Sequence, residues 1–517
     1  MSVLRILVYA CLVTLQAAAH KRDVFDKPNI VWIVADDLGY GDLASYGHPT
    51  QEYGGVDAMA QKGLRFTQAY VPDTLCTPSR AAFLTGRYPA RLGMYGSKKR
   101  VLLPFNPNGL NRSEIIVPEA LKSAGYTTGM VGKWHLGINR TPNMDGYYLP
   151  SNHGFDFVGI NHPNTNNHKC EETIREPAVE RCFIYRGDHI VSQPFRHDNL
   201  TDMMVQDAVG FFERNKRRPF FFYMALFQPH VPLRVNPRFH LSSRRGRIGD
   251  NLNEMNWAVS EVNSALKRLR IHKNTLVIFH SDHGPQAEFC AEGGNAGILS
   301  GYKTNSWEGG VRVPFITYWP GVIKPGVSRE VITSLDLFPT FVNLTGGTMP
   351  TDRAYDGLNI RDTLLYGAAS PHGALFFYCA DRLMAVRYGN YKLHFHTHRL
   401  RTPSFFAIDG VCGNGGEATG QFYLDCVNCR GDCISDHDPP LVFDVEKDPS
   451  EIYALNITET PGLAFVVETV AEHVRAHEET MTVAPPLFDE VDRSVVPCCN
   501  PPHCRCNYTP PPPEWDY

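Results

Sequence analysis

Acidic and basic side chains follow four apolar stretches of the sequence that are predicted to be buried β-strands. They are Asp36 and Asp37 after residues 30–35, Lys133 and His135 after 127–131, His230 after 220–226, and Asp282 and His283 after 276–279. In an open α/β sheet the carboxyl ends of the parallel strands meet at one edge, and ligands bind outside that edge. We therefore expect these side chains to lie together.

Three of these groups, Asp36, Asp37 and Asp282, are carboxylates, the ligands that calcium and magnesium prefer. Lysines and histidines beside such a metal would face an anion bound to it. A metal and neighbouring cations together neutralise negative charge that develops on a transferred group. The pattern predicts hydrolysis of an oxyanion ester, and it leaves phosphate and sulfate esters open.

A cysteine at the predicted start of a helix helps to distinguish between phosphate and sulfate esters as the substrate. The chain has 14 cysteines, and removing Cys11 with an N-terminal leader leaves an odd number. In an oxidising compartment, an odd number suggests that one cysteine has a role outside a disulfide. Cys76 precedes Pro78 at the start of a helix expected to run to about Thr85. Free N–H groups at a helix N-terminus favour a bound anion, which makes Cys76 a candidate for this role.

The motif C-x-P-S-R at residues 76–80, followed by L-T-G-R at 84–87, resembles the signature of the sulfatase family. Residues 28–42, 132–137 and 303–314 are similar to further segments of that family. Residues 383–392 are similar to its branch that holds arylsulfatase A and steryl-sulfatase. The membrane hairpin of steryl-sulfatase has no counterpart here, because polar residues 186–218 occupy its place.

The resemblance implies an alkaline-phosphatase-like fold and a set of roles for individual residues. A formylglycine-generating enzyme would convert Cys76 to formylglycine, which then attacks sulfur. Asp36, Asp37, Asp282 and the modified Cys76 would bind one calcium ion. The remaining roles are Arg80 and Lys133 holding the nucleophile, His135 as base, and His230 and Lys303 at the leaving oxygen.

His283 departs from the family pattern, which often has Asn or Gln after the last metal aspartate. Imidazole suits transition metals better than calcium. His283 is therefore expected either to ligate the metal or to bind the sulfate.

Two other functions remain as alternatives to a sulfatase. One is a phosphatase or phosphodiesterase of the same superfamily, which usually needs two metals and a Ser or Thr nucleophile. The other is a catalytically inactive protein that binds sulfated glycans. For a sulfatase, aryl, sterol and glycan sulfates all remain possible substrates.

The elements that must position these residues alternate between strands and helices, which predicts a largely parallel sheet flanked by helices. The expected helices span residues 56–62, 118–124, 201–215 and 252–269. After residue 366 short strands at 375–378, 384–387, 392–396 and 442–445, with a helix at 463–477, predict a smaller antiparallel sheet. We expect a catalytic domain at 20–366 and a C-terminal subdomain at 367–517, with a cysteine-rich and proline-rich tail.

The N-terminus and the composition indicate an exported protein. Residues 1–19 have the positive start, apolar stretch and small-residue end of a signal peptide. The apolar stretch is too short to span a membrane, and no later apolar run is long enough. We expect a lysosomal or secreted protein. A net charge of −4 argues against nucleic-acid binding, and the oligomeric state stays open.

Export also predicts glycans and disulfides. Glycosylation sequons begin at Asn111, Asn139, Asn199, Asn343, Asn456 and Asn507. Cys170 and Cys182 are expected to pair with each other. The tail cysteines 498, 499, 504 and 506 are expected to pair chiefly among themselves or with nearby cysteines. Cys426, Cys429 and Cys433 resemble a zinc knuckle, but disulfides are the favoured interpretation.

Overall fold

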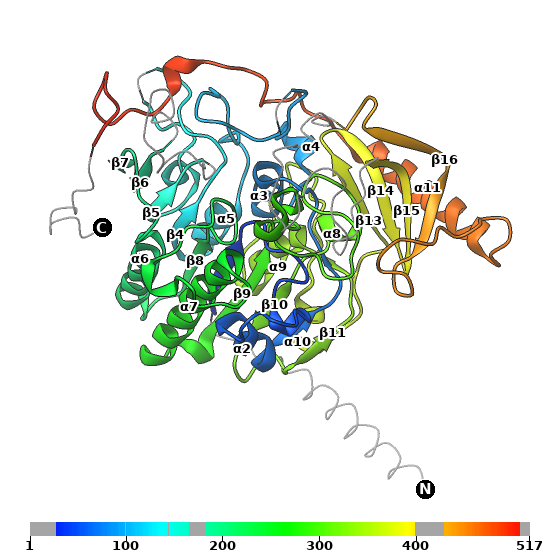
Figure 1. Cartoon of the computed structure of the whole chain (residues 1–517), viewed down its shortest axis with the longest axis horizontal. Helices are drawn as coiled ribbons and strands as arrows, with labels where there is room; N and C mark the ends of the chain where they lie inside the picture. The colour runs from blue at the N-terminus through cyan, green and yellow to red at the C-terminus, as the bar shows by residue number, and fades with distance from the viewer. Residues whose placement is uncertain (1–26, 99, 143, 165–181, 399–428, 507–517) are drawn as a thin grey trace, which may run out of the picture.

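A large mixed β-sheet forms the centre of the molecule (Figure 1). The computed structural model describes residues 27–98, 100–142, 144–164, 182–398 and 429–506. The strands of this sheet are β1 (Asn29–Ala35), β2 (Leu64–Phe66), β4 (Thr127–Lys133), β5 (Phe157–His162), β6 (Ile184–Arg186), β7 (His189–Ser192), β8 (Phe220–Ala225), β9 (Thr275–Ser281), β10 (Phe315–Tyr318) and β11 (Gly326–Ser328). Their order is β11-β2-β10-β9-β1-β8-β4-β5-β6-β7.

The middle of the sheet is parallel, and its strands β1, β8 and β9 are buried along their whole length. β1 pairs with β8 and β9, and β4 pairs with β5 and β8, all in parallel, while β10, β6 and β7 run antiparallel to their neighbours. Side chains of a strand alternate between faces. In β1, Val31 and Ile33 enter one apolar core, whereas Trp32 and Val34 enter another. A strand buried on both faces needs the continuous apolar run that residues 30–35 have.

Helices cover both faces of the sheet. They are α2 (Gly55–Lys62), α3 (Cys76–Thr85), α4 (Pro89–Leu92), α5 (Val117–Ser123), α6 (Leu200–Asn215), α7 (Arg247–Arg268), α8 (Glu308–Val311), α9 (Leu337–Leu344) and α10 (Arg361–Tyr366). Side chains of α2, α6 and α7 pack in the core on one face, and those of α3, α5, α9 and α10 in the core on the other. The predicted α/β architecture with a mostly parallel sheet is confirmed.

A second, smaller sheet is antiparallel and lies beside the large one (Figure 1). It contains β13 (Ala374–Cys379), β14 (Arg382–Tyr388), β15 (Tyr391–His398) and β16 (Ile434–Asp444). Helix α11 (Leu463–Thr480) packs Leu463 and Val470 against its apolar face. A short pair, β3 (Ala69–Tyr70) and β12 (Ile332–Thr333), completes the strands of the residues that the structure describes. The small sheet with one helix is as expected, and the domain division after residue 366 stays a prediction.

The disulfides predicted from the sequence can be compared with those of the described residues. The tail pairs internally, through Cys498–Cys504 and Cys499–Cys506. Cys429 forms a disulfide with Cys379, as favoured over a zinc knuckle. The expected Cys170–Cys182 bridge involves Cys170, which lies outside the described residues.

The sequons differ in accessibility. Asn111, Asn199, Asn343 and Asn456 are exposed. Asn139 is buried, and its side-chain amide donates to the carbonyl of Val495 at 2.8 Å, so in the folded protein it is unsuited to carry a glycan. Asn507 lies outside the described residues, as does the expected signal peptide. Among the helices of the described ranges, none has both the length and the hydrophobicity that a membrane span requires.

Candidate active site

Three buried carboxylates meet where β1 and β9 end. The two strands are parallel neighbours, with Ala35 opposite Ser281, so Asp36 and Asp282 leave the sheet side by side. The amide of Asp37 donates to Oδ1 of Asp282 at 3.1 Å. Each of the three aspartates is at most 2% exposed. Asp37 has a φ of 65°, a left-handed conformation that is uncommon outside glycine and is often found at functional sites.

Each carboxylate has a buried cation beside it. Nζ of Lys133, the last residue of β4, lies 2.6 Å from Oδ2 of Asp36. The guanidinium of Arg80 reaches Oδ2 of Asp282 at 2.9 Å, and Nζ of Lys303 lies 2.8 Å from Oδ1 of Asp37. Three negative charges are thus balanced by three positive ones inside the protein. Buried charges require such pairing, because an isolated ion would lose its hydration without compensation.

Cys76 lies at the centre of this cluster. It is the first residue of α3, which ends at Gly86 in a left-handed C-cap. Its Sγ is 3.7 Å from Oδ1 of Asp36 and 3.4 Å from Nε2 of His283. Cys76 is buried and is the free cysteine of the described residues, which confirms that it is not half of a disulfide. Burial opposes ionisation, but Lys133 and Lys303 dominate and hold the pKa of the thiol well below its usual value.

The histidines surround the same point. His283 donates through Nδ1 to the carbonyl of Gly284 at 2.9 Å, which turns Nε2 toward Asp37 and Asp282 at 3.3 and 3.6 Å. Burial disfavours its charge, but Asp282 and Cys76 outweigh burial and raise its pKa to about 9. Nε2 of His230 lies 3.7 Å from Oδ2 of Asp37.

His135 follows β4 and is fully buried, with Nε2 3.0 Å from the carbonyl of Leu102. Burial is the largest influence on its pKa and lowers it, although the neighbouring Cys76 acts in the opposite direction. His135 is therefore mostly neutral at neutral pH, as a proton acceptor must be.

Possible metal ligands converge in two overlapping groups. Asp36 and Cys76 belong to both; Asp37 and His230 complete one, and Asp282 and His283 the other. Within each group one ligand atom per residue lies within 4.8 Å of all the others. These groups contain six of the site residues predicted from the sequence. Arg80, Lys133 and Lys303 pair with their carboxylates, and His135 interacts with Cys76.

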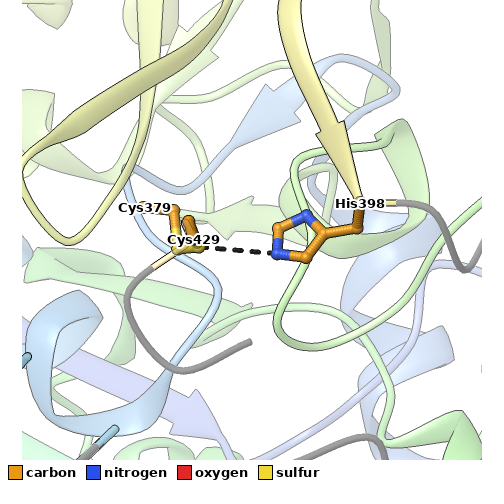
Figure 2. Close-up of side chains that lie close together, drawn as sticks. All are labelled: Cys379, His398 and Cys429. Carbon is orange, nitrogen blue, oxygen red and sulfur yellow. Dashed lines mark hydrogen bonds between the residues drawn. A yellow bond between two sulfur atoms is a disulfide. The ribbon is translucent and has the colours of Figure 1, made fainter. Parts of the chain in front are cut away.

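A third group of possible ligands lies elsewhere. Figure 2 shows His398 beside Cys379 and Cys429, with Nε2 of the ring 3.4 Å from Sγ of Cys429. The two cysteines are joined as a disulfide, so neither is available as a thiolate ligand.

The sequence did not reveal several residues that shape the site. Asp73 is buried three residues before Cys76, and desolvation raises its pKa to about 7 although the amides of Thr74 and Leu75 oppose this. The hydroxyl of Ser79 donates to the carbonyl of Asp282 at 2.6 Å, which fixes α3 against the end of β9. Both residues lie within three positions of Cys76 in the sequence, and this proximity could have predicted that they belong to the site.

Comparisons with known proteins agree with this geometry. A family model described as Sulfatase matches residues 28–347, and one described as C-terminal region of aryl-sulfatase matches 370–506. An arylsulfatase of Hemicentrotus pulcherrimus is 50% identical over 498 residues, covering 96% of this chain and 89% of the relative. Human arylsulfatase A is 38% identical, covering 85% of this chain and 86% of its own.

Among solved structures, the PsFucS1 sulfatase from Pseudoalteromonas sp. shares the fold, with a TM-score of 0.74. The match covers 94% of this chain and 95% of that one at 23% identity. Extensive matches over both parts of the chain and a shared fold lead to one conclusion: this chain belongs to the sulfatase family and is a sulfuric ester hydrolase of the arylsulfatase type.

Proposed function

We propose that this protein hydrolyses sulfate monoesters with a formylglycine made from Cys76 and one bound calcium ion. The observation that carries the proposal is a free, buried cysteine at a helix N-terminus, packed among three carboxylates and three cations. A hydrated formylglycine would supply two hydroxyl groups on one carbon, one to attack sulfur and one whose deprotonation expels sulfate.

The residues present fit a calcium ion. Asp36, Asp37 and Asp282 offer hard oxygen ligands, and an oxygen of Asp36 lies within 4.8 Å of one from Asp37 in one group and of one from Asp282 in the other. Because lysine and arginine already balance these carboxylates, the two positive charges of a calcium ion would be offset by the single negative charge of a bound sulfate monoester and by that of the deprotonated nucleophile. Bound calcium would supply positive charge to the ester oxygens and to the nucleophile.

His283 is proposed as a metal ligand. Donation from its Nδ1 to the carbonyl of Gly284 fixes the ring and leaves Nε2 facing Asp37 and Asp282. Such a hydrogen bond behind the ring is the usual support for a histidine ligand. It favours metal ligation over the alternative in which His283 binds sulfate.

The other groups receive roles from their positions around Cys76. Lys133 and Arg80 hold the nucleophile and screen its charge. His135, neutral because it is buried, accepts the proton during sulfate release. His230 and Lys303 stand on the Asp37 side, where they stabilise or protonate the leaving oxygen.

Maturation would require a formylglycine-generating enzyme acting on the segment that contains Cys76. It would take place in the secretory pathway, with a lysosomal or extracellular destination. The predicted signal peptide and the disulfides of the described residues support this route.

An assay of the purified protein with one aryl sulfate and the matching aryl phosphate tests the proposal. The sulfate should be hydrolysed and the phosphate should not. Preferential hydrolysis of the phosphate would favour a phosphatase, and binding of a sulfated glycan with no turnover of either ester would indicate an inactive binding protein.

A further inference from the structure

Glu288 is a buried carboxylate beside the active site that the proposed mechanism does not use. It lies in the short helix η6 (Ala287–Glu292), a few residues after His283, and is 4% exposed. Its neighbour Gln286 accepts from Nζ of Lys303 at 3.4 Å. Glu288 itself is close enough to Lys303 and Asp37 to interact with their charges. Through Gln286, the segment that carries Glu288 contacts Lys303, one of the two residues proposed to act at the leaving oxygen.

One oxygen of this carboxylate, Oε2, is buried and has no hydrogen-bond partner among the described residues. Leaving a buried acceptor unsatisfied is unfavourable, so native proteins rarely do it without a reason. Glu288 is also absent from both groups of converging metal ligands. A donor on a bound substrate is the simplest partner for Oε2.

A second buried atom without a hydrogen-bond partner in the described ranges belongs to the small sheet. His398, the last residue of β15, is 8% exposed and contacts the Cys379–Cys429 disulfide through Nε2 (Figure 2). Its other ring nitrogen, Nδ1, is buried without a partner in the described ranges. The positive charge of Arg100 acts to lower the pKa of both Glu288 and His398.

We infer that Glu288 is a specificity-determining residue that accepts a hydrogen bond from a hydroxyl or amino group adjacent to the sulfated carbon of the leaving alcohol. This inference rests on the proposed function. A sugar sulfate carries such a donor next to its ester oxygen, whereas a simple phenyl sulfate or a sterol sulfate does not. A site built to bond a substrate hydroxyl rejects an analogue without it, because its own polar group is then left unpaired. The enzyme should therefore prefer sulfated sugars.

The test compares Glu288→Gln with wild type on three esters: a hexose sulfate, the same sugar lacking the hydroxyl next to the sulfate, and p-nitrophenyl sulfate. For the hexose sulfate, the substitution should lower kcat/KM about 10- to 100-fold, the range expected for a hydrogen bond to a charged group. The deoxy sugar should be a similarly poor substrate of the wild type, and the substitution should affect it and the aryl sulfate less than about 3-fold.

Glu292→Gln is the matched control, because Glu292 ends the same short helix and makes a solvent-exposed ion pair with Arg247. It should change none of the three rates. The deoxy sugar tests the wild type directly and remains informative if Glu288→Gln folds poorly, which thermal unfolding would reveal.

Equal losses on all three esters would overturn the inference, since Glu288 would then act by positioning Lys303. No loss on any ester would also overturn it, since water would satisfy Oε2. So would a wild type that hydrolyses the aryl sulfate but no hexose sulfate. A wild type that hydrolyses no sulfate ester at all would instead defeat the proposed function.

Discussion

Two buried clusters of charge lie in this molecule, and they are built differently. In the active-site cluster the carboxylates lie close together around the buried free cysteine, Cys76. The second cluster, at the junction with the small sheet, contains Glu308, Lys392, Glu451, His394 and Arg387. There Nζ of Lys392 lies 3.0 Å from Glu308 and 3.6 Å from Glu451. The lysine separates the two carboxylates.

The junction cluster is also closed by hydrogen bonds to groups of fixed position. Glu451 accepts from the amide of Glu308 at 2.7 Å and contacts Nε2 of His394 at 2.6 Å. The hydroxyl of Tyr70 donates to Glu308 at 2.8 Å. Such a network rigidifies a structure, and it leaves no group of like-charged ligands for an ion to fill. The comparison indicates that convergence of like charges, rather than buried charge itself, marks the functional site.

Substitution of Cys76 should have the largest effect on activity. Cys76→Ala should be inert because it has no nucleophile. Cys76→Ser should fold and be sulfated once, but it should then stall because a serine ester has no second hydroxyl with which to expel sulfate. Intact-mass measurement after incubation with an aryl sulfate would detect the stalled form. Steady turnover by Cys76→Ser would refute the two-hydroxyl mechanism.

Asp36→Ala should lower kcat by about 100- to 1,000-fold, a loss comparable to removal of a key electrostatic stabiliser in other enzymes. It removes a proposed metal ligand and leaves Lys133 without its partner, so thermal stability should fall as well. Prolonged treatment with a chelator should reproduce the loss in the wild type, and calcium should restore it. Full activity of this variant in metal-free buffer would contradict the metal assignment.

The matching change in the junction cluster is Lys392→Met. It leaves Glu308 and Glu451 buried without their lysine and should cost about 3–5 kcal/mol of unfolding free energy. Where the variant remains folded, kcat should stay within about 3-fold of wild type, since small rate changes correspond to under 1 kcal/mol. Denaturant unfolding and kinetics at low temperature measure the two quantities. A loss of kcat as large as that of Asp36→Ala would end the distinction between the clusters.

The smallest expected effect is on the pH profile. Burial lowers the pKa of His135 below its ordinary value of 6.5. Because a base must be neutral, the rate should fall only as the pH drops through this lowered pKa, so activity should persist into the acid range. The logarithm of kcat measured from about pH 4 to 9 should bend on the acid side below the pKa of an ordinary histidine. A midpoint above pH 7 on that limb would exclude His135 as the base.

The parts that could be predicted from the sequence are those with local patterns. Residues 30–35 are a continuous β-branched run, and Pro78 marks the first turn of α3, so the strand, the helix and the groups at their ends were foreseeable. Because the carboxyl ends of parallel strands meet at one edge of a sheet, these groups could also be predicted to lie together.

The rest depends on contacts between distant residues. Glu451 meets Glu308 across 143 positions and His394 across 57, and no local pattern signals either contact. Glu288 follows no predicted strand directly, and its importance rests on a buried oxygen without a partner. The burial of Asn139 was likewise invisible, because its sequon has the same form as the exposed ones.

The chemical state of Cys76 tests the central claim most directly. The measurement is mass spectrometry of the tryptic peptide that ends at Arg80, taken from enzyme of known specific activity. The account predicts formylglycine at position 76, with the sulfur of cysteine replaced by an aldehyde oxygen, and a modified fraction that rises in proportion to activity. Unmodified Cys76 in fully active enzyme would contradict it.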